Sequence, residues 1–326
     1  MIAWLTAALV AAAIPQGDAV YRFEIAGRRV GAATLEVHCD GTLCSARWST
    51  RMRLPEEAGG ELSSTDVTVA IDPTGRSLGD RTRIVRDGAA RTEAVATGSV
   101  PAMIAPLLLS DGAPRELGRC VDAFDEETAE RGLACVEQAR KGRRQLEVMG
   151  VAMAVAPGAD GFPDAIDIPV QRARWVRDPS AAPPSTPPRL FGVRLPGPAG
   201  RPVLCGADPD PAPGAAAAGI PAPSATGKTC RERTLDWLAR AARAGFMGRV
   251  AVGAAFDGVA LAWHAWAEVR SGGSWIAVDP TFGQLPARGP RFTVARYDPA
   301  NPAERLAAGR RLLECWMREG SRATSP

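Results

Sequence analysis

Three residues able to support nucleophilic catalysis occur in order between Gly227 and Gly283: Cys230, His264 and Asp279. A thiol attacks a carbonyl carbon once an imidazole takes its proton, and a carboxylate can fix the tautomer and orientation of that imidazole. We therefore expect Cys230 to be a nucleophile, His264 its general base and acid, and Asp279 the orienting carboxylate. The predicted chemistry is acyl transfer through a thioester at Cys230.

A helix is expected to position the cysteine. Apolar residues recur at helical spacing from about residue 230 to 244, and Gly245 is a suitable stop. Thr229 and Glu232 have the spacing of a capping box, which places Cys230 at the first helical position. There the unpaired amides and the helix dipole should lower the pKa of the thiol, and the same amides could stabilise an oxyanion.

A hairpin is expected to bring the other two residues together. The runs 260–270 and 274–279 are apolar and strand-like, and Ser271-Gly272-Gly273 between them is typical of a turn. If Ser271 and Gly272 form a two-residue loop, His264 and Asp279 lie directly opposite each other. A three-residue loop would instead place His264 beside Pro280.

Four fragments around these residues are GKTCRE, RAGFMGRVAVG, WHAWAEV and SWIAVDPTFGQ. Together they resemble the transglutaminase-like superfamily, whose fold is papain-related, and suggest an exported bacterial-type member with an N-terminal β-rich domain. The matching fragments lie within residues 225–290. The resemblance implies an α+β fold in which a catalytic helix packs on an antiparallel sheet, and it gives Cys230, His264 and Asp279 the roles named above.

The sequence does not decide whether water or an amine completes the reaction. Water would resolve the thioester in a protease, amidase or deamidase, whereas an amine would resolve it in a protein cross-linking enzyme or ligase. Either way, the expected substrate is a protein or peptide with an amide group. The alternative from another class is a non-catalytic binding or scaffold protein that keeps the same core as a module.

A weaker alternative is a P-loop NTPase. Ala222–Thr229 reads APSATGKT, which fits a permissive phosphate-loop pattern that includes Lys228, and Asp279 would then be the magnesium ligand. A phosphate loop directly follows an apolar strand, whereas residues 209–223 are rich in proline and alanine. This context argues against nucleotide binding.

The N-terminus and the cysteines predict an exported protein, periplasmic or extracellular. Residues 1–19 have the short apolar core of a signal peptide, with cleavage expected after Ala19 and a competing site at Ala11-Ala12-Ala13. Apart from Cys230 there are six cysteines, an even number that suits disulfides. Hairpin placement favours the pairs Cys39–Cys44 and Cys120–Cys135, which leaves Cys205 with Cys315. Seven ordinary thiols in a reducing compartment are the alternative.

The remaining sequence predicts a β-rich N-terminal domain and a linker. Residues 20–177 contain many alternating or β-branched runs separated by turn signals, typical of an antiparallel meander, a curled sheet or an open barrel. Residues 178–224 read as a Pro/Ala-rich linker with short strands, and residues 225–326 as the catalytic domain. Only residues 101–109 and 302–319 look helical outside the catalytic helix.

The composition of the chain limits the classes of partner that we expect. The formal net charge of +3 is close to balanced and the sequence has no basic stripe, so there is no electrostatic case for nucleic acid. The N-terminal apolar run is too short for a membrane span, so no stable span is expected after signal cleavage. The sequence predicts neither a metal nor a cofactor.

Overall fold

The structure is a computed structural model that describes residues 14–79, 81–95, 97–110, 120–140, 143–190, 205, 219–256 and 259–322. The protein is mostly β, with 49% of residues in strands and 16% in helices. The expected α+β class is therefore wrong. The reason is the size of the N-terminal part, whose strands all join one sheet, while only three α-helices occur among the described residues.

Thirteen strands form the large sheet, which is antiparallel except where the short β7 pairs with β8 in parallel. The alternation of buried and partly exposed residues along β1 and β4 is the pattern of strands with one face in a core. The strands are β1 (Gly17–Ile25), β2 (Arg28–Asp40), β3 (Leu43–Arg53), β4 (Leu62–Ile71), β5 (Arg81–Arg86), β6 (Ala89–Ala94), β7 (Val100–Pro101), β8 (Cys120–Phe124), β9 (Arg131–Arg140), β10 (Arg143–Val148), β11 (Val151–Pro157), β12 (Pro163–Ile168) and β13 (Ala173–Arg177).

The large sheet is strongly curved. Strands β3 and β13 are separated by β2 and β1 in the strand order, a distance of roughly 14 Å in a flat sheet. Nevertheless the rings of Trp48 on β3 and Trp175 on β13 lie 5.2 Å apart, edge to face. The helix α1 (Ala105–Ser110) packs against β9 to β12, and Leu107 belongs to the core inside the curve.

The remaining strands form a small sheet in the order β16-β15-β14-β17. These strands are β14 (Gly248–Phe256), β15 (Leu261–Ser271), β16 (Ser274–Val278) and β17 (Arg291–Tyr297). Helix α2 (Cys230–Arg243) packs on β15 and β14. The second large hydrophobic cluster contains Trp237, Trp263 and Val250, all buried, and it continues into residues of β1, β2 and α3.

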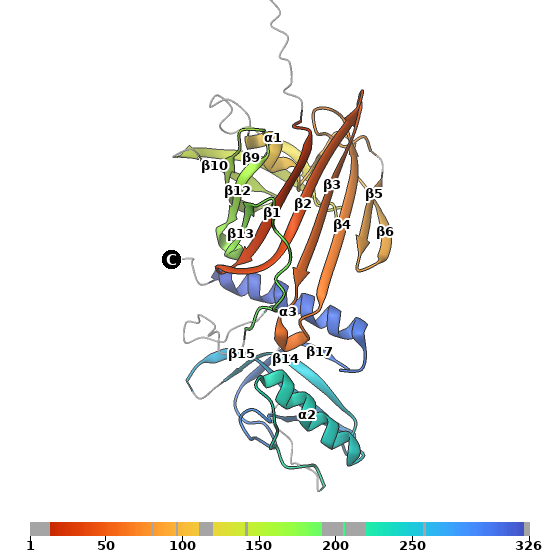
Figure 1. Ribbon diagram of the computed structural model, residues 1–326, viewed down its shortest axis with the longest axis vertical. Coiled ribbons are helices and arrows are strands. Elements are labelled where there is room, and N and C mark those ends of the chain that lie inside the picture. Colours follow the sequence, from red (N-terminus) through yellow and green to blue (C-terminus); the bar gives the residue numbers. More distant parts are fainter. Residues whose placement is uncertain are drawn as a thin grey trace, which may run out of the picture.

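Helix α3 (Pro302–Arg322) lies between the two sheets (Figure 1). It contacts β17, and it also contacts two 3-10 helices of the N-terminal part, η1 (Glu56–Ala58) and η3 (Pro169–Gln171). Arg305 of α3 forms an ion pair with Glu61 at 2.6 Å. The change of sheet falls between Arg177 and Gly248, but the predicted domain limits themselves stay a prediction.

All three predicted disulfides are confirmed: Cys39–Cys44, Cys120–Cys135 and Cys205–Cys315. The first two join directly paired positions of neighbouring strands. The third ties residue 205, in the predicted linker, to α3. Three disulfides are consistent with an exported protein.

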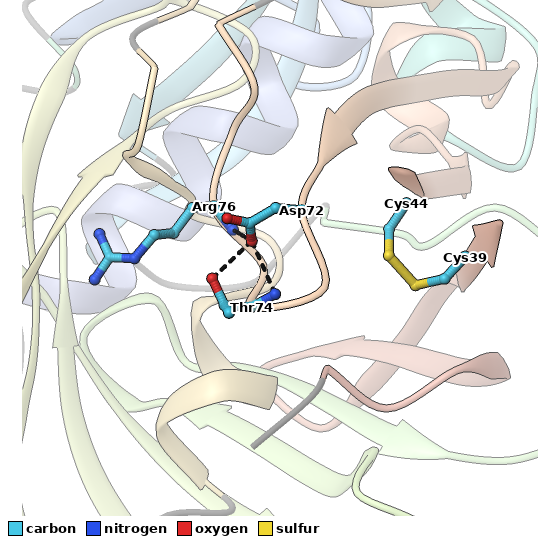
Figure 2. The surroundings of a disulfide bond; sticks show 5 residues. All are labelled: Cys39, Cys44, Asp72, Thr74 and Arg76. Carbon is cyan, nitrogen blue, oxygen red and sulfur yellow. Dashed lines mark hydrogen bonds between the residues drawn. A yellow bond between two sulfur atoms is a disulfide. The ribbon is translucent and has the colours of Figure 1, made fainter. Parts of the chain in front are cut away.

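Asp72 orders the turn after β4. Oδ1 of Asp72 accepts hydrogen bonds from the backbone N–H of Thr74 at 2.8 Å and of Arg76 at 3.0 Å, and from the Thr74 hydroxyl (Figure 2). Figure 2 also shows the Cys39–Cys44 disulfide on the hairpin of β2 and β3.

No helix in the described ranges combines the length and the apolar character needed to cross a membrane.

Candidate active site

Cys230 is the first residue of α2, as the sequence predicts. Thr229 is the N-cap, and its hydroxyl oxygen accepts a hydrogen bond from the Glu232 N–H at 3.1 Å. The Glu232 carboxylate in turn accepts from the Thr229 N–H at 3.1 Å, so the capping box is confirmed. This reciprocal pair fixes where the helix begins, and therefore where the cysteine lies.

Ala265 on β15 links the helix to the strand that carries the histidine. The Cys230 sulfur accepts hydrogen bonds from the backbone N–H of Ala265 and of Arg231. One turn further along α2, the buried Thr234 hydroxyl donates to the Ala265 carbonyl oxygen at 3.3 Å. The thiol is therefore held against the residue that directly follows His264.

The expected register of the hairpin is wrong by two residues. Ser271 pairs with Ser274, so Gly272 and Gly273 form the two-residue loop, both with positive φ. Two glycines in a row suit a type I′ turn better than a serine and a glycine do. A shift of two residues keeps every side chain on its expected face, so His264 and Asp279 still meet, diagonally instead of directly opposite.

The imidazole and the carboxylate form a buried hydrogen bond. His264 Nε2 lies 2.9 Å from Oδ2 of Asp279, and neither side chain is more than 1% exposed. A carboxylate has no proton to donate, so Nε2 carries the proton and Nδ1 of the neutral ring is the basic nitrogen. The ring stacks on Phe282 with centroids 4.8 Å apart, which fixes its plane.

Arg291 on β17 is a third member of this group, and sequence reasoning missed it. Its Nη2 donates to Oδ2 of Asp279 at 2.9 Å. Backbone N–H groups of Thr281 and Phe282 each donate to Oδ1 at 3.1 Å. Burial alone would raise the pKa of Asp279, but the hydrogen bonds from His264 and Arg291, together with the positive charge of Arg291, bring it below its ordinary value. The carboxylate is thus held ionised.

The expected lowering of the cysteine pKa is wrong for this structure. Burial raises the pKa of the Cys230 thiol well above its ordinary value, and the nearby Glu57 carboxylate raises it further. The two amides that donate to the sulfur act in the opposite direction but do not compensate. Only 2% of Cys230 is exposed, so the loss of water outweighs the helix terminus.

The N-terminal part covers the cysteine, a feature that the sequence did not predict. Glu57 and Ala58 of η1 are buried, and η1 contacts both α2 and β15. Arg231 donates to the Tyr297 hydroxyl at 3.3 Å, and that hydroxyl donates to the Glu57 carbonyl oxygen at 3.3 Å. These bonds hold the turn between β3 and β4 against the start of α2. Glu57 and Tyr297 are far from Cys230 in sequence, so only the fold shows their proximity.

The segment 222–229, the alternative phosphate loop, makes contacts that do not suit phosphate binding. Residues 219–229 contain no strand, and the indole N–H of Trp237 donates to the Ala222 carbonyl oxygen at 3.1 Å. The backbone N–H groups of Lys228, at 2.6 Å, and of Thr229 donate to the Glu232 carboxylate. A bound phosphate would need these same N–H groups. Among the described residues there is also no group of three His, Cys, Asp or Glu side chains suited to a metal ion.

The second histidine lies far from this site in sequence and is exposed. His38, on β2, is 3.5 Å from Asp18 and has a side chain 68% exposed.

Comparisons of the chain with protein-family models, with curated proteins and with solved structures found no match.

Proposed function

We propose that this protein is a cysteine-dependent acyl-transfer enzyme acting on carboxamide or peptide bonds through a thioester at Cys230. The observation that carries the proposal is the buried hydrogen bond between His264 and Asp279. Ala265, the next residue after His264, donates its backbone N–H to the Cys230 sulfur. An imidazole with its tautomer fixed by an ionised carboxylate is the base that a cysteine nucleophile needs. The transglutaminase-like resemblance of residues 225–290 supports the same roles.

The proposed reaction has two steps. The thiol proton of Cys230 passes to Nδ1 of His264 as the sulfur forms a bond to the substrate carbonyl carbon. The imidazolium then gives this proton to the leaving amine or ammonia, and a thioester remains. Backbone N–H groups of Arg231 and Ala265, which donate to the sulfur, are the donors that we propose for the oxyanion. Water or an amine then attacks the thioester carbon, and the thiol is regenerated.

The neutral thiol of the structure fits this order of events. A thiol with a raised pKa is not a preformed thiolate, so its proton must leave as the substrate binds. His264 would serve as a general base in the reaction itself and not only as the partner of a resting ion pair. Removal of the Glu57 carboxylate from the thiol would make this proton transfer easier.

The compartment belongs to the same proposal. Three disulfides suit the oxidising space outside the cytoplasm, and residues 1–13, of which the structure describes nothing, fit the core of a signal peptide. Gly17–Ala19 belong to β1, and Ala19 is buried in the core of the large sheet. Cleavage at the competing Ala11-Ala12-Ala13 site would leave β1 whole, whereas cleavage after Ala19 would remove its first three residues.

The experiment uses unfolded casein as a general amide substrate, with and without a fluorescent primary amine. Peptide fragments or released ammonia would indicate hydrolysis, and incorporated amine would indicate transamidation. Either activity should disappear in Cys230→Ser and His264→Ala but persist in the matched control His38→Ala. Activity that survives Cys230→Ser would contradict the proposal and favour the scaffold alternative for this site.

A further inference from the structure

A second concave site lies in the large sheet, separate from the candidate active site. It is a cavity of about 320 Å³ between the curved sheet and the start of α1. All its lining residues fall between residues 48 and 175, so none comes from the small sheet or from α2. Its chemical character is given by six of them: Trp48, Met103, Glu126, Met149, Met153 and Trp175.

The walls are aromatic and sulfur-rich. The two indoles meet edge to face, and Phe23 stacks on the ring of Trp175 with centroids 3.9 Å apart. This stacking fixes the indole planes, so the wall is preformed. Indole faces and methionine sulfurs are polarisable surfaces that suit an apolar body, and an indole face also attracts a cation.

One end of the cavity is acidic. Asp125, Glu126 and Glu127 all line it, and no lysine or arginine is found among its described lining residues. Two of the three carboxylates are engaged elsewhere: Asp125 accepts the turn amides of Glu127 and Thr128, and Glu127 forms an ion pair with Arg86. Glu126 is the one buried member of the three, and the Met103 N–H donates to its Oε1, so we take its carboxyl as the group that meets a ligand.

Glu126 is unusually placed for a charged residue. It is 8% exposed, and its Oε1 accepts a hydrogen bond from the Met103 N–H at 2.6 Å. Burial raises its pKa to about 8, so the group is mostly neutral at pH 7. A cation entering the cavity would favour the ionised form, whereas an anion would meet acidic residues and no lysine or arginine among the described lining residues, and Arg86 is paired with Glu127.

We propose that this cavity binds a small organic cation, a primary ammonium group on an apolar body, with the ammonium on Glu126 and the apolar body between the indoles and methionines. Charge complementarity and the aromatic wall together argue for this class. The inference does not depend on the proposed acyl transfer, because the two sites share no residue.

The test is a calorimetric titration of the full mature chain with phenethylammonium, and with 2-phenylethanol as its neutral isostere. At pH 8 we expect the ammonium to bind at least about tenfold more tightly than the alcohol, since a charged hydrogen bond is stronger than a neutral one. Glu126→Gln keeps the size of the side chain and should bring the two affinities together. Glu130→Gln, an exposed acidic residue four positions away, should leave them apart.

The pH dependence gives a second readout that needs no variant. The ammonium keeps its proton up to about pH 9, because alkylammonium pKa values lie near ~10. Its affinity should therefore rise by about tenfold or more from pH 6 to pH 8, as Glu126 ionises. Equal affinity for the alcohol, a flat pH profile in the wild type, or tighter binding of dodecanoate would each overturn the proposal.

Discussion

His264 Nε2 lies 2.9 Å from Oδ2 of Asp279, and the same oxygen lies 2.9 Å from Nη2 of Arg291. This carboxylate therefore serves both the proposed chemistry and stability. Replacing Asp279 by Asn leaves the charge of Arg291 buried without its partner, which should cost about 3–5 kcal/mol in free energy of unfolding at pH 7. Urea denaturation of the two proteins measures this difference.

The difference between wild type and Asp279→Asn should depend on pH. The pKa of Asp279 is lower in the folded state than its ordinary value of 3.8, so its contribution to stability is present above about pH 4. That contribution is lost as the pH falls through the folded-state value. The gap in unfolding free energy should be constant from pH 5 to 7 and shrink below pH 4. A gap that widens in acid would contradict the assigned ionisation.

Thr234 should matter for the placement of the cysteine helix. Thr234→Val keeps the shape of the side chain but removes the hydrogen bond to the Ala265 carbonyl oxygen, at a cost of about 1 kcal/mol. Thr234→Ser retains the hydroxyl and is the matched control. We expect thermal unfolding of the valine variant at a lower temperature, together with slower alkylation of Cys230. Equal thermal stability of all three proteins would show that this bond does not anchor α2.

Glu57 should hold the thiol neutral. Its carboxylate adds to the effect of burial in raising the pKa of Cys230, so Glu57→Gln should lower that pKa and increase the rate of thiol alkylation at pH 8. Glu56→Gln, on the same turn, removes a charge that pairs with Arg189 and should have little effect. If both variants are alkylated at the wild-type rate, the negative charge of Glu57 does not influence the pKa of Cys230.

The three disulfides should differ in their contribution to stability. Cys205–Cys315 closes a loop of 110 residues, which corresponds to about 4–5 kcal/mol of loop entropy, whereas Cys39–Cys44 closes one of five residues, or about 2 kcal/mol. Alanine replacement of both partners in each pair, followed by denaturant unfolding, tests the order. A greater loss from removing Cys39–Cys44 would contradict it.

Local signals made the start of α2 and the disulfides predictable. A capping box, a hairpin turn and an even number of remaining cysteines are all short-range features, and each was found as expected. The hairpin register was missed because Ser271-Gly272 and Gly272-Gly273 are both acceptable loops in sequence. The faces still matched because strand side chains alternate with a period of two.

Long-range features could not be predicted in the same way. The pKa of Cys230 depends on burial beneath η1, about 170 residues earlier in the chain, and no local pattern encodes that contact. Arg291 lies on β17, which is separated from β16 by two strands of the small sheet, so its contact with Asp279 follows from the fold and not from a local pattern. The predicted α+β class was wrong because the C-terminal motifs carry no information on the thirteen-stranded sheet that precedes them.

The most direct test of the central claim is the pH dependence of iodoacetamide labelling at Cys230, mapped by peptide mass, in wild type, His264→Ala and His38→Ala. We expect labelling at Cys230 alone, at least about tenfold slower in His264→Ala than in the other two at pH 7, because the imidazole base is lost. As the pH rises toward the pKa of the thiol the three rates should draw closer together, since more thiolate then forms without a base. Identical profiles for all three proteins over the whole pH range would contradict the pairing of Cys230 with His264.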